Sequence, residues 1–439
     1  RDMGRHCWRG TALSIGMKTP IAISDSANFY VSAERLFEPS LKNTPVIVLS
    51  NNDGCAVARS NEAKALGIKM GAPLHKLNDI IHKHGVRVFS SNYTLYGDIS
   101  RRVVEVYQEF SPTVEVYSID ECFMDLGGFK DREAHAQEMR QEVLRRVGIP
   151  VRVGIASTKT LAKCANDIAK KNALFDGVLD MMDRQLVDWL LPKVPVSDIW
   201  GIGRKTNKKL NELGIYTAAD LQRMPIKQAR SVGTVVLEKT VLELQGEPCL
   251  ALDEVEPQRK GMAVTRSSGT PMFDFDVLFE AVTAHTTRAA EKLRQNELAA
   301  GTLTVFFHTN RHKPDRPQYA GSRSIQLSPM SCDTFELVNA ARKCALAAWP
   351  KAHSNQYGFT KAGVMLDDLL PIEKQPLTLF DTAKPKPNPA VEALDQINRK
   401  FGAKTITLGS EGVEQSWRMR SAHRSPRYTT RLSDLPIVR

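Results

Sequence analysis

Two short apolar strands in the first third of the chain lead directly into acidic residues. One strand (PIAISD) ends at Asp25, and another (VEVYSI) runs into the adjacent pair Asp120 and Glu121. The residues that follow (CFMDL) return as the second arm of a hairpin. An acidic pair at such a place is also typical of a plain solvated turn. A sheet that brings both strand ends together would instead gather three carboxylates, and Mg²⁺ prefers such hard oxygen ligands.

Strands and helices mix throughout the first 185 residues, which predicts an α+β fold. The predicted strands are 20–25, 44–50, 86–90, 114–119, 122–126 and 151–156, and the predicted helices are 60–66, 95–110, 132–147 and 158–172. Boundary signals support the helices, because Gly67 stops the first and Ser157 or Thr158 caps the last. A chain of 439 residues is too long for one hydrophobic core, so we expect several domains.

The composition shifts near Pro192. Short helices flank the sequence WGIG, and residues 253–260 (DEVEPQRK) are a charged linker. After this linker the predicted order is strand, helix, strand, strand, helix, strand, the split βαβ pattern of a small α+β domain. These elements are predicted at 261–267, 276–296, 302–309, 322–328, 334–348 and 360–367. Residues 371–390, rich in proline and lysine, are predicted to be a tether.

The net charge of +11 favours a polyanionic partner. No apolar run approaches the roughly 20 residues that span a bilayer, so we expect no membrane association. The seven cysteines are odd in number and form no C-x-x-C pair, which indicates reduced, cytoplasmic thiols rather than disulfides or zinc. Residues 1–16 lack the apolar region of a secretory signal, and a strand closely follows Met17. We interpret them as a misassigned start or a non-native leader.

Basic residues near two predicted helices are candidates for phosphate contacts, since phosphoryl transfer depends on positioning and charge neutralisation. They are Arg59 and Lys64 in or beside helix 60–66, and Lys163, Lys170 and Lys171 in helix 158–172. A solvated helix face would explain any one of them equally well. Arg266, near the end of strand 261–267, is a candidate contact for a template phosphate.

The motif Gly201-Ile-Gly203 lies between short helices and resembles a helix-hairpin-helix. Its glycines let the backbone approach a DNA phosphate, and the next helix offers free N–H groups at that point. A plain turn would show the same spacing. Three lysines that follow favour DNA binding; they are Lys205, Lys208 and Lys209.

Several motifs in a fixed order identify a family. The run DSANFY from Asp25 to Tyr30 resembles the opening motif of the Y-family translesion DNA polymerases. YSIDE (117–121) and VGIASTKTLAK (153–163) resemble two further motifs, and DIWGIG (198–203) resembles the thumb hairpin. These motifs lie within residues 20–370. The runs LSNNDG, FSSNY and SPRYTTR resemble the branch of bacterial DNA polymerase V catalytic subunits, the UmuC type.

The resemblance implies a metal site and an activity. Two Mg²⁺ ions would be held by Asp25, Asp120 and Glu121, with the Ser26 carbonyl as a further ligand. The ions would activate a primer 3′-hydroxyl and hold the leaving pyrophosphate. The activity would be error-prone translesion synthesis on primer–template DNA, including damaged template, during an SOS-type response in the bacterial cytoplasm at the nucleoid.

The resemblance also implies contacts with the incoming dNTP. Tyr30 would be the steric gate where a ribose 2′-hydroxyl would lie, and Phe29 would line the sugar pocket. Lys170 would meet the triphosphate. Asn61 and Lys64 stand where many relatives carry tyrosine and arginine, and lysine offers a point charge rather than a bidentate fork.

The implied architecture is a right hand. Its parts are a palm at 17–36 and 86–185, fingers at 37–85, a helix-hairpin-helix thumb at 186–252 and a little finger at 253–370. No segment resembles a proofreading exonuclease.

Two further segments carry predictions about partners. Residues 375–380 resemble the peptide that binds the bacterial sliding clamp, through Gln375, Leu377, Leu379 and Phe380. Those apolar side chains could instead dock on the chain's own little finger. The basic region 391–439 has arginines interleaved with Trp417 and Tyr428 near its end. By resemblance to its branch, this region would bind a UmuD-type accessory dimer, with a RecA filament as a further partner of the enzyme. Template DNA is the alternative.

Two other functions share some of these features. One is a non-catalytic helix-hairpin-helix subunit that binds DNA and has a decayed palm, against which the full set of three acids argues. The other is a nucleotidyl cyclase, by analogy with palm-like folds. The thumb hairpin and the basic C-terminal region argue against a cyclase.

Overall fold

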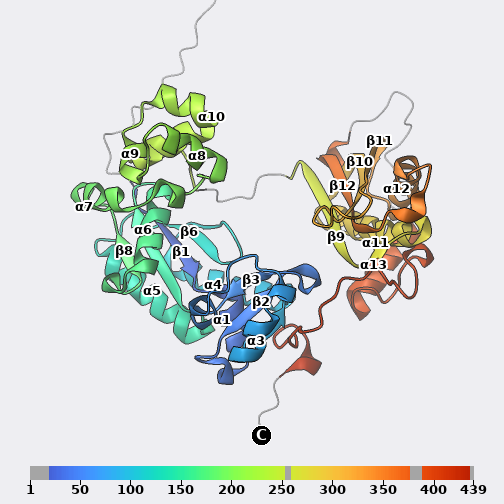
Figure 1. Ribbon diagram of the computed structural model, residues 1–439, viewed down its shortest axis with the longest axis horizontal. Coiled ribbons are helices and arrows are strands. Elements are labelled where there is room, and N and C mark those ends of the chain that lie inside the picture. Colours follow the sequence, from blue (N-terminus) through green and yellow to red (C-terminus); the bar gives the residue numbers. More distant parts are fainter. Residues whose placement is uncertain (1–18, 253–258, 376–387, 436–439) are drawn as a thin grey trace, which may run out of the picture.

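Three sheets organise the part of the chain that the computed structural model describes, residues 19–252, 259–375 and 388–435. Figure 1 shows them along an open arc, with the helices α8, α9 and α10 at one end and the strands β9 to β12 at the other. The predicted leader 1–16, most of the predicted charged linker and most of the clamp-binding peptide lie outside the described residues.

The first sheet has five strands in the order β5-β6-β1-β7-β8. They are β1 (Ile21–Ser26), β5 (Val114–Val116), β6 (Glu121–Asp125), β7 (Val151–Ala156) and β8 (Val178–Asp180). The predicted hairpin is present, but its first arm ends at Val116 and its second begins at Glu121. The arm is shorter because the Tyr117 and Ser118 amides both donate to the Glu121 carbonyl and close the loop early.

Strand β1 is central because its side chains alternate between two apolar cores. Ile21 and Ile23 belong to one core and Ala22 to the other. Helix α6 (Lys159–Lys171) packs in the first core, while α4 (Tyr93–Phe110) and α5 (Arg132–Val147) pack in the second. Thr158 caps α6 by accepting from the Leu161 amide.

A smaller sheet has the order β3-β2-β4. Its strands are β2 (Val46–Leu49), β3 (Ala56–Arg59) and β4 (Arg87–Ser90), and the neighbouring helices are α1 (Phe29–Arg35), α2 (Asn61–Ala65) and α3 (Asn78–His84). The sequence analysis missed β3 and α3. Strand β3 is only AVAR, with little β-branched character, and α3 buries none of its residues, so neither has a strong local signal.

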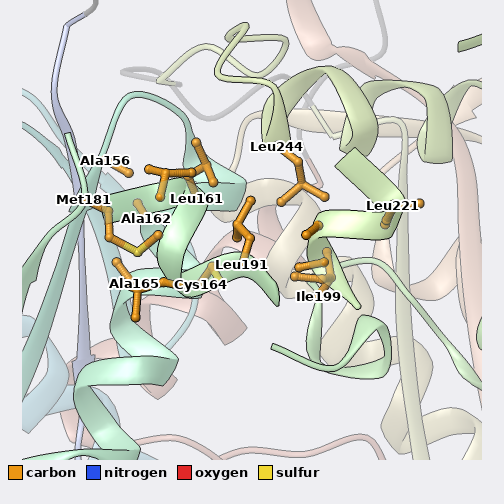
Figure 2. Close-up of a cluster of buried hydrophobic side chains, with 14 of the residues drawn as sticks. Ala156, Leu161, Ala162, Cys164, Ala165, Met181, Leu191, Ile199, Leu221 and Leu244 are labelled. Carbon is orange, nitrogen blue, oxygen red and sulfur yellow. The ribbon is translucent and has the colours of Figure 1, made fainter. Parts of the chain in front are cut away.

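Four helices follow the first sheet. They are α7 (Arg184–Leu190), α8 (Arg204–Glu212), α9 (Ala218–Gln222) and α10 (Ile226–Leu244), the last interrupted at Gly233 and Thr234. Figure 2 shows Leu161 and Cys164 of α6 close to Leu191, which directly follows α7, and one hydrophobic core also includes Leu221 of α9 and Leu244 of α10. One continuous core therefore joins these helices to the first sheet.

The third sheet has the strand order β11-β10-β12-β9. Its elements are β9 (Gly261–Met272), α11 (Phe275–Gln295), β10 (Leu298–Thr309), β11 (Ala320–Ser331), α12 (Thr334–Ala348) and β12 (Phe359–Pro371). This is the predicted β-α-β-β-α-β order. The strands run longer than predicted, since β9 continues past Ser267 through a register shift against β12 and pairs Met272 with Phe359.

Short 3₁₀ helices connect these elements. They lie at Pro39–Leu41, Asn51–Asp53, Leu74–Lys76, Ala173–Phe175, Leu191–Lys193, Val196–Asp198, Ser354–Gln356, Ile372–Lys374, Gly409–Glu411 and Leu432–Asp434.

The C-terminal region is built into the fold. Helix α13 (Pro389–Phe401) begins inside the predicted tether, and its Asp395 forms an ion pair with Arg294 of α11 at 2.7 Å. Trp417 is buried in the core of the third sheet. The Tyr428 ring stacks on Phe37 with centroids 4.4 Å apart. Trp417 therefore cannot anchor a partner protein as predicted, because it is buried within the chain. Tyr428 also has an internal partner but is only part-buried, so its predicted role remains a prediction.

No helix in the described residues is long and apolar enough to cross a membrane. The cysteines among those residues are all free.

Candidate active site

The three acids predicted from the strand ends meet at one edge of the first sheet. Asp25 lies opposite Glu121 in the β1–β6 register. The Ser26 amide donates to the Asp120 carbonyl over 2.8 Å, which holds the loop beside the end of β1. The Ser118 hydroxyl donates to the Asp120 carboxylate over 2.7 Å and accepts from the Glu121 amide. Local hydrogen bonds therefore fix the adjacent acids beside Asp25.

Lysines of α6 face two of these carboxylates. Lys163 Nζ lies 2.7 Å from Glu121 Oε1, and Lys170 Nζ lies 3.5 Å from Asp25 Oδ1. Helix α6 approaches β7 closely at Gly154, where a Cβ would lie 2.2 Å from the Asn166 backbone nitrogen. The glycine therefore sets how near the lysines come to the acids.

Burial raises the pKa of Asp25 above its usual value of 3.8. Lys170 lowers this pKa, while the charges of Asp120 and Glu121 raise it. The charged Asp25 is thus less favourable in the folded chain than in the unfolded chain. Repulsion among the negative charges of Asp25, Asp120 and Glu121 therefore lowers the stability of the folded chain.

We predict that Asp25→Asn raises the melting temperature at pH 7 in a buffer without divalent metal. A carboxyl whose pKa is higher in the folded chain than in the unfolded chain lowers the free energy of unfolding as the pH rises through these two pKa values. Asparagine does not ionise, so the Asp25→Asn variant avoids this loss. The gain should shrink below about pH 4, where the carboxyl is protonated in both states. Calorimetry at both pH values checks this, and an equal or lower melting temperature at pH 7 would contradict it.

The donor set fits a hard divalent cation. Carboxylates from Asp25, Asp120 and Glu121 converge on one sheet edge, and a cation would relieve the repulsion that they exert on one another. Among the described residues no three acidic, histidine or cysteine side chains are grouped closely enough to hold a metal ion as they stand. One of the three carboxylates, that of Glu121, is paired with Lys163 of α6.

A cleft of about 630 Å³ opens beside the acids. Predicted site residues from four segments line it: Asp25, Ser26, Phe29, Tyr30, Lys64, Asp120 and Lys170. It is also lined by Asn28 and Arg59, among others. Phe29 is buried, and the Tyr30 ring stacks on Tyr96 with centroids 4.5 Å apart. Acids and aromatic rings therefore share one cleft.

The cleft also gathers positive charge. Burial lowers the pKa of Lys64, and the charges of Lys170, Arg59 and Arg152 lower it further. Such crowding of cations suits a polyanionic group such as a triphosphate. The sequence analysis missed Arg152, which lies on strand β7 rather than on one of the basic helices.

Asn28 is a second residue that the sequence analysis missed. It precedes α1 in the left-handed conformation, with φ of 47°. Its side chain accepts from Lys64 Nζ at 2.6 Å and donates to Asn61 Oδ1 at 3.1 Å. Asn28 therefore connects the two predicted nucleotide contacts. Asparagine tolerates this conformation better than most residues, which was an available signal within DSANFY.

Two other lysines of α6 have partners away from the cleft. Lys163 pairs with Glu121 and lies over the rings of Tyr117 and Trp200. Lys171 pairs with Asp198. Of the three basic residues considered on this helix, only Lys170 lines the cleft.

The predicted DNA contacts lie elsewhere in the fold. Gly201 has φ of +88°, which favours glycine, and Gly203 is the N-cap of α8. Lys205 is exposed in the first turn of that helix. Arg266 is exposed on β9, in the interior of the strand rather than near its end. Gln375 is the last described residue before the gap, and Leu377, Leu379 and Phe380 lie outside the described residues.

Comparison with known protein families covers most of the chain. Residues 24–167 match the impB/mucB/samB family, and residues 259–379 match the C-terminal domain of that family. Residues 187–215 match the helix-hairpin-helix motif of the same family. Residues 390–438 match a domain of unknown function.

Comparison with individual proteins also finds relatives that match most of the chain. The chain is 43% identical over 424 residues to Protein UmuC of Salmonella typhimurium, covering 95% of this chain and 100% of that protein. It is 34% identical over 421 residues to DNA polymerase IV 2 of Mesorhizobium japonicum, covering 89% and 94%.

A solved structure of a chimeric Y-family DNA polymerase superimposes with a TM-score of 0.62 at 21% identity, covering 80% of this chain and 99% of that chain. The predicted fold, a right-hand polymerase with a helix-hairpin-helix thumb, is thereby confirmed. From these matches over nearly its whole length, the chain belongs to the impB/mucB/samB family and has the fold of the Y-family DNA polymerases.

Proposed function

We propose that this chain is an error-prone translesion DNA polymerase of the SOS-type damage response, which adds deoxynucleotides to a primer by two-metal nucleotidyl transfer. One observation carries the proposal. Three carboxylates lie at a sheet edge beside a cleft that also contains cations and a stacked aromatic ring. Relatives named as DNA polymerases and the shared fold support the same activity.

We assign the parts of the right hand from the resemblance, and the three sheets support the assignment. The first sheet belongs to the palm (17–36 and 86–185). Strands β2 and β3 of the small sheet belong to the fingers (37–85), while its third strand, β4, falls within the bounds of the palm. Helices α7 to α10 are the thumb (186–252), and the third sheet is the little finger (253–370). The continuous core between α6 and the thumb helices supports a thumb that moves with the palm.

The polar and aromatic residues in and beside the cleft have the following proposed tasks. Asp25, Asp120 and Glu121, with the Ser26 carbonyl, hold two Mg²⁺ ions, which supply charge stabilisation of the attacking and leaving oxygens. Lys64, Lys170 and Arg59 neutralise the triphosphate, and Asn61 supports Lys64 through Asn28. Phe29 lines the sugar pocket and Tyr30 closes the space that a 2′-hydroxyl needs.

The DNA contacts lie outside the cleft. The Gly201–Gly203 turn binds phosphates of one DNA strand through the free backbone amides at the start of α8, and Lys205 adds a positive charge beside them. Arg266 on β9 meets the template strand from the little finger. These contacts bind the DNA backbone and do not read the base sequence. A polymerase needs such contacts because it must copy templates of any sequence.

Primer extension separates this proposal from its alternatives. The chain is incubated with Mg²⁺, all four dNTPs and an undamaged primer–template, and the products are resolved by size. We expect stepwise primer extension. Binding without extension would support the non-catalytic DNA-binding subunit, and cyclic nucleotide without extension would support a cyclase.

The partners are proposed from the resemblance to the UmuC branch. They are a UmuD-type accessory dimer, a RecA filament and the sliding clamp, which place the enzyme at the nucleoid in the bacterial cytoplasm. Because Trp417 and Tyr428 pack internally, the accessory dimer would meet exposed arginines of the C-terminal region, among them Arg424 and Arg431.

We predict that replacing both Leu379 and Phe380 with alanine abolishes stimulation of synthesis by the sliding clamp. Extended peptides bind grooves through alternate side chains, so loss of two apolar anchors removes most of the affinity. Extension is measured with and without loaded clamp, and the basal rate without clamp should be unchanged. Full stimulation of the double variant would show that the clamp binds elsewhere.

A further inference from the structure

The ring of Tyr30 rests on a second ring that is itself fully buried. Tyr96 of α4 stacks against Tyr30 with an interplanar angle of 17°, and Tyr96 is fully buried. Tyr93 from the same helix meets Tyr30 edge-on at 6.0 Å. Tyr30 therefore has an aromatic support on the side away from the solvent.

The hydroxyl of Tyr96 ties this support to the helix that carries Tyr30. It donates to Glu34 Oε1 over 2.6 Å, and Glu34 is 2% exposed. Glu34 lies one turn after Tyr30 on α1, so both project from the same side of that helix. Stacking and a hydrogen bond thus join Tyr96 to α1 at two points.

The C-terminal region supplies the second hydrogen bond to Glu34. Ser425 Oγ donates to Glu34 Oε1 over 3.0 Å, and Ser425 is buried. Asn92, the N-cap residue of α4, donates to the Ser425 hydroxyl and carbonyl oxygens. A residue more than 300 positions away in the sequence therefore completes the hydrogen bonding behind Tyr30.

Residues 416–428, which we term the C-terminal strap, are held by further hydrogen bonds at residues that precede Ser425. Figure 1 shows this segment leaving the third sheet and crossing to the lobe that contains β2 and β3. The Gly269 amide of β9 donates to the Trp417 carbonyl, and the Ser90 amide of β4 donates to the His423 carbonyl. The Ala422 amide donates to the Asp53 carboxylate. The strap lies within the domain of unknown function, residues 390–438.

We propose that Tyr96 and Ser425 are positioning residues for sugar selection, through which the C-terminal strap holds the Tyr30 ring in place. This inference rests on the proposed role of Tyr30 as the steric gate. It adds a task for the C-terminal domain within the polymerase itself, distinct from any partner that the exposed arginines bind.

Steric exclusion requires a ring that cannot move aside. A ring that can tilt by a small amount admits the extra hydroxyl at low cost, whereas a ring fixed by packing does not. Loss of Ser425 leaves the buried Glu34 carboxylate with one donor fewer, and loss of the Tyr96 ring removes the support directly. Both changes should loosen the gate and leave the acids, Lys64 and Lys170 in place.

The test measures kcat/KM for a dNTP and for the matching rNTP, and takes their ratio as the sugar selectivity. Tyr96→Phe deletes one hydrogen bond to Glu34, and Ser425→Ala deletes another together with the bond that the Ser425 hydroxyl accepts from Asn92. Each variant should lower selectivity about three- to tenfold. Tyr96→Leu removes the ring and should lower it further. Glu34→Gln keeps an acceptor oxygen and should retain more selectivity than Glu34→Ala.

Matched controls delete hydroxyl groups elsewhere. Tyr319→Phe removes a tyrosine hydroxyl that donates to the Ala348 carbonyl in the third sheet, and Ser433→Ala removes an exposed serine hydroxyl near the C-terminus. Both should leave selectivity unchanged. Circular dichroism confirms that each variant is folded, and the conservative Tyr96→Phe keeps the test valid if Tyr96→Leu does not fold.

Combination with Tyr30→Ala identifies the cause. If Ser425 acts through Tyr30, then Ser425→Ala should lower selectivity in the wild-type background and change nothing when Tyr30 is already alanine. An equal loss in both backgrounds, or no loss in either while Tyr30→Ala lowers selectivity, would overturn the inference. If Tyr30→Ala itself leaves selectivity unchanged, the gate assignment in the proposed function fails instead.

Discussion

Replacing Asp120 with asparagine, or Glu121 with glutamine, should lower the rate of nucleotide addition by about 10³-fold or more. Each change removes one charged oxygen ligand from the site where the in-line transition state needs charge stabilisation. The loops should keep their shape, because the Ser26 amide bonds to the Asp120 backbone carbonyl and not to its side chain. Binding of primer–template DNA should therefore change little.

The measurement is a single-turnover rate with saturating Mg²⁺ and dNTP, together with a DNA affinity for each variant. Asp125→Asn is the matched control, since Asp125 lies at the far end of the same strand and caps the turn at Gly127. The control should retain near-normal rates. Near-normal extension by Asp120→Asn or Glu121→Gln would remove the two-metal assignment.

Replacing Tyr30 with alanine should lower the discrimination against ribonucleotides by about 100-fold. The ring lines the cleft beside Asp25 and stacks on Tyr96, so its truncation opens space next to the metal site without touching an acid. The effect should appear mainly as a higher kcat/KM for the rNTP. Tyr30→Phe keeps the ring and should behave like the wild type.

The ratio of kcat/KM for the dNTP and the rNTP tests whether Tyr30 is the steric gate. If the alanine variant still rejects ribonucleotides as well as the parent, another group closes the sugar pocket. Phe29 would be the next candidate, because it is buried in the same cleft.

Local patterns predicted the elements that carry the acids. The apolar strands that lead into Asp25 and into Asp120 and Glu121 could be recognised in the sequence. That Asp25 lies opposite Glu121 was not predictable from spacing, because it depends on the antiparallel register of two strands far apart in the chain. The β-α-β-β-α-β order was predictable, since each element has its own periodicity and boundary residues. The roles in the cleft came from the family motifs rather than from these patterns.

Contacts between segments that are far apart in the sequence could not be predicted from local patterns. Trp417 meets His285, Tyr428 stacks on Phe37 and Ser425 donates to Glu34, and nothing near each residue in the sequence specifies its partner. The arginine-rich composition around these residues suggested an exposed binding tail, while the aromatic rings had internal partners. Asn28 was missed because its role depends on a left-handed backbone and on Lys64, which lies on a different element.

Bypass of a defined lesion tests the central claim most directly. The wild-type chain is given Mg²⁺, dNTPs and a primer–template with a single abasic site, with and without a UmuD-type dimer and a RecA filament, and the products are resolved at single-nucleotide length. The account predicts insertion opposite the abasic site and extension beyond it, lost in Asp120→Asn. Normal extension on undamaged template with a complete stop before the lesion, under every combination of partners, would contradict a translesion polymerase.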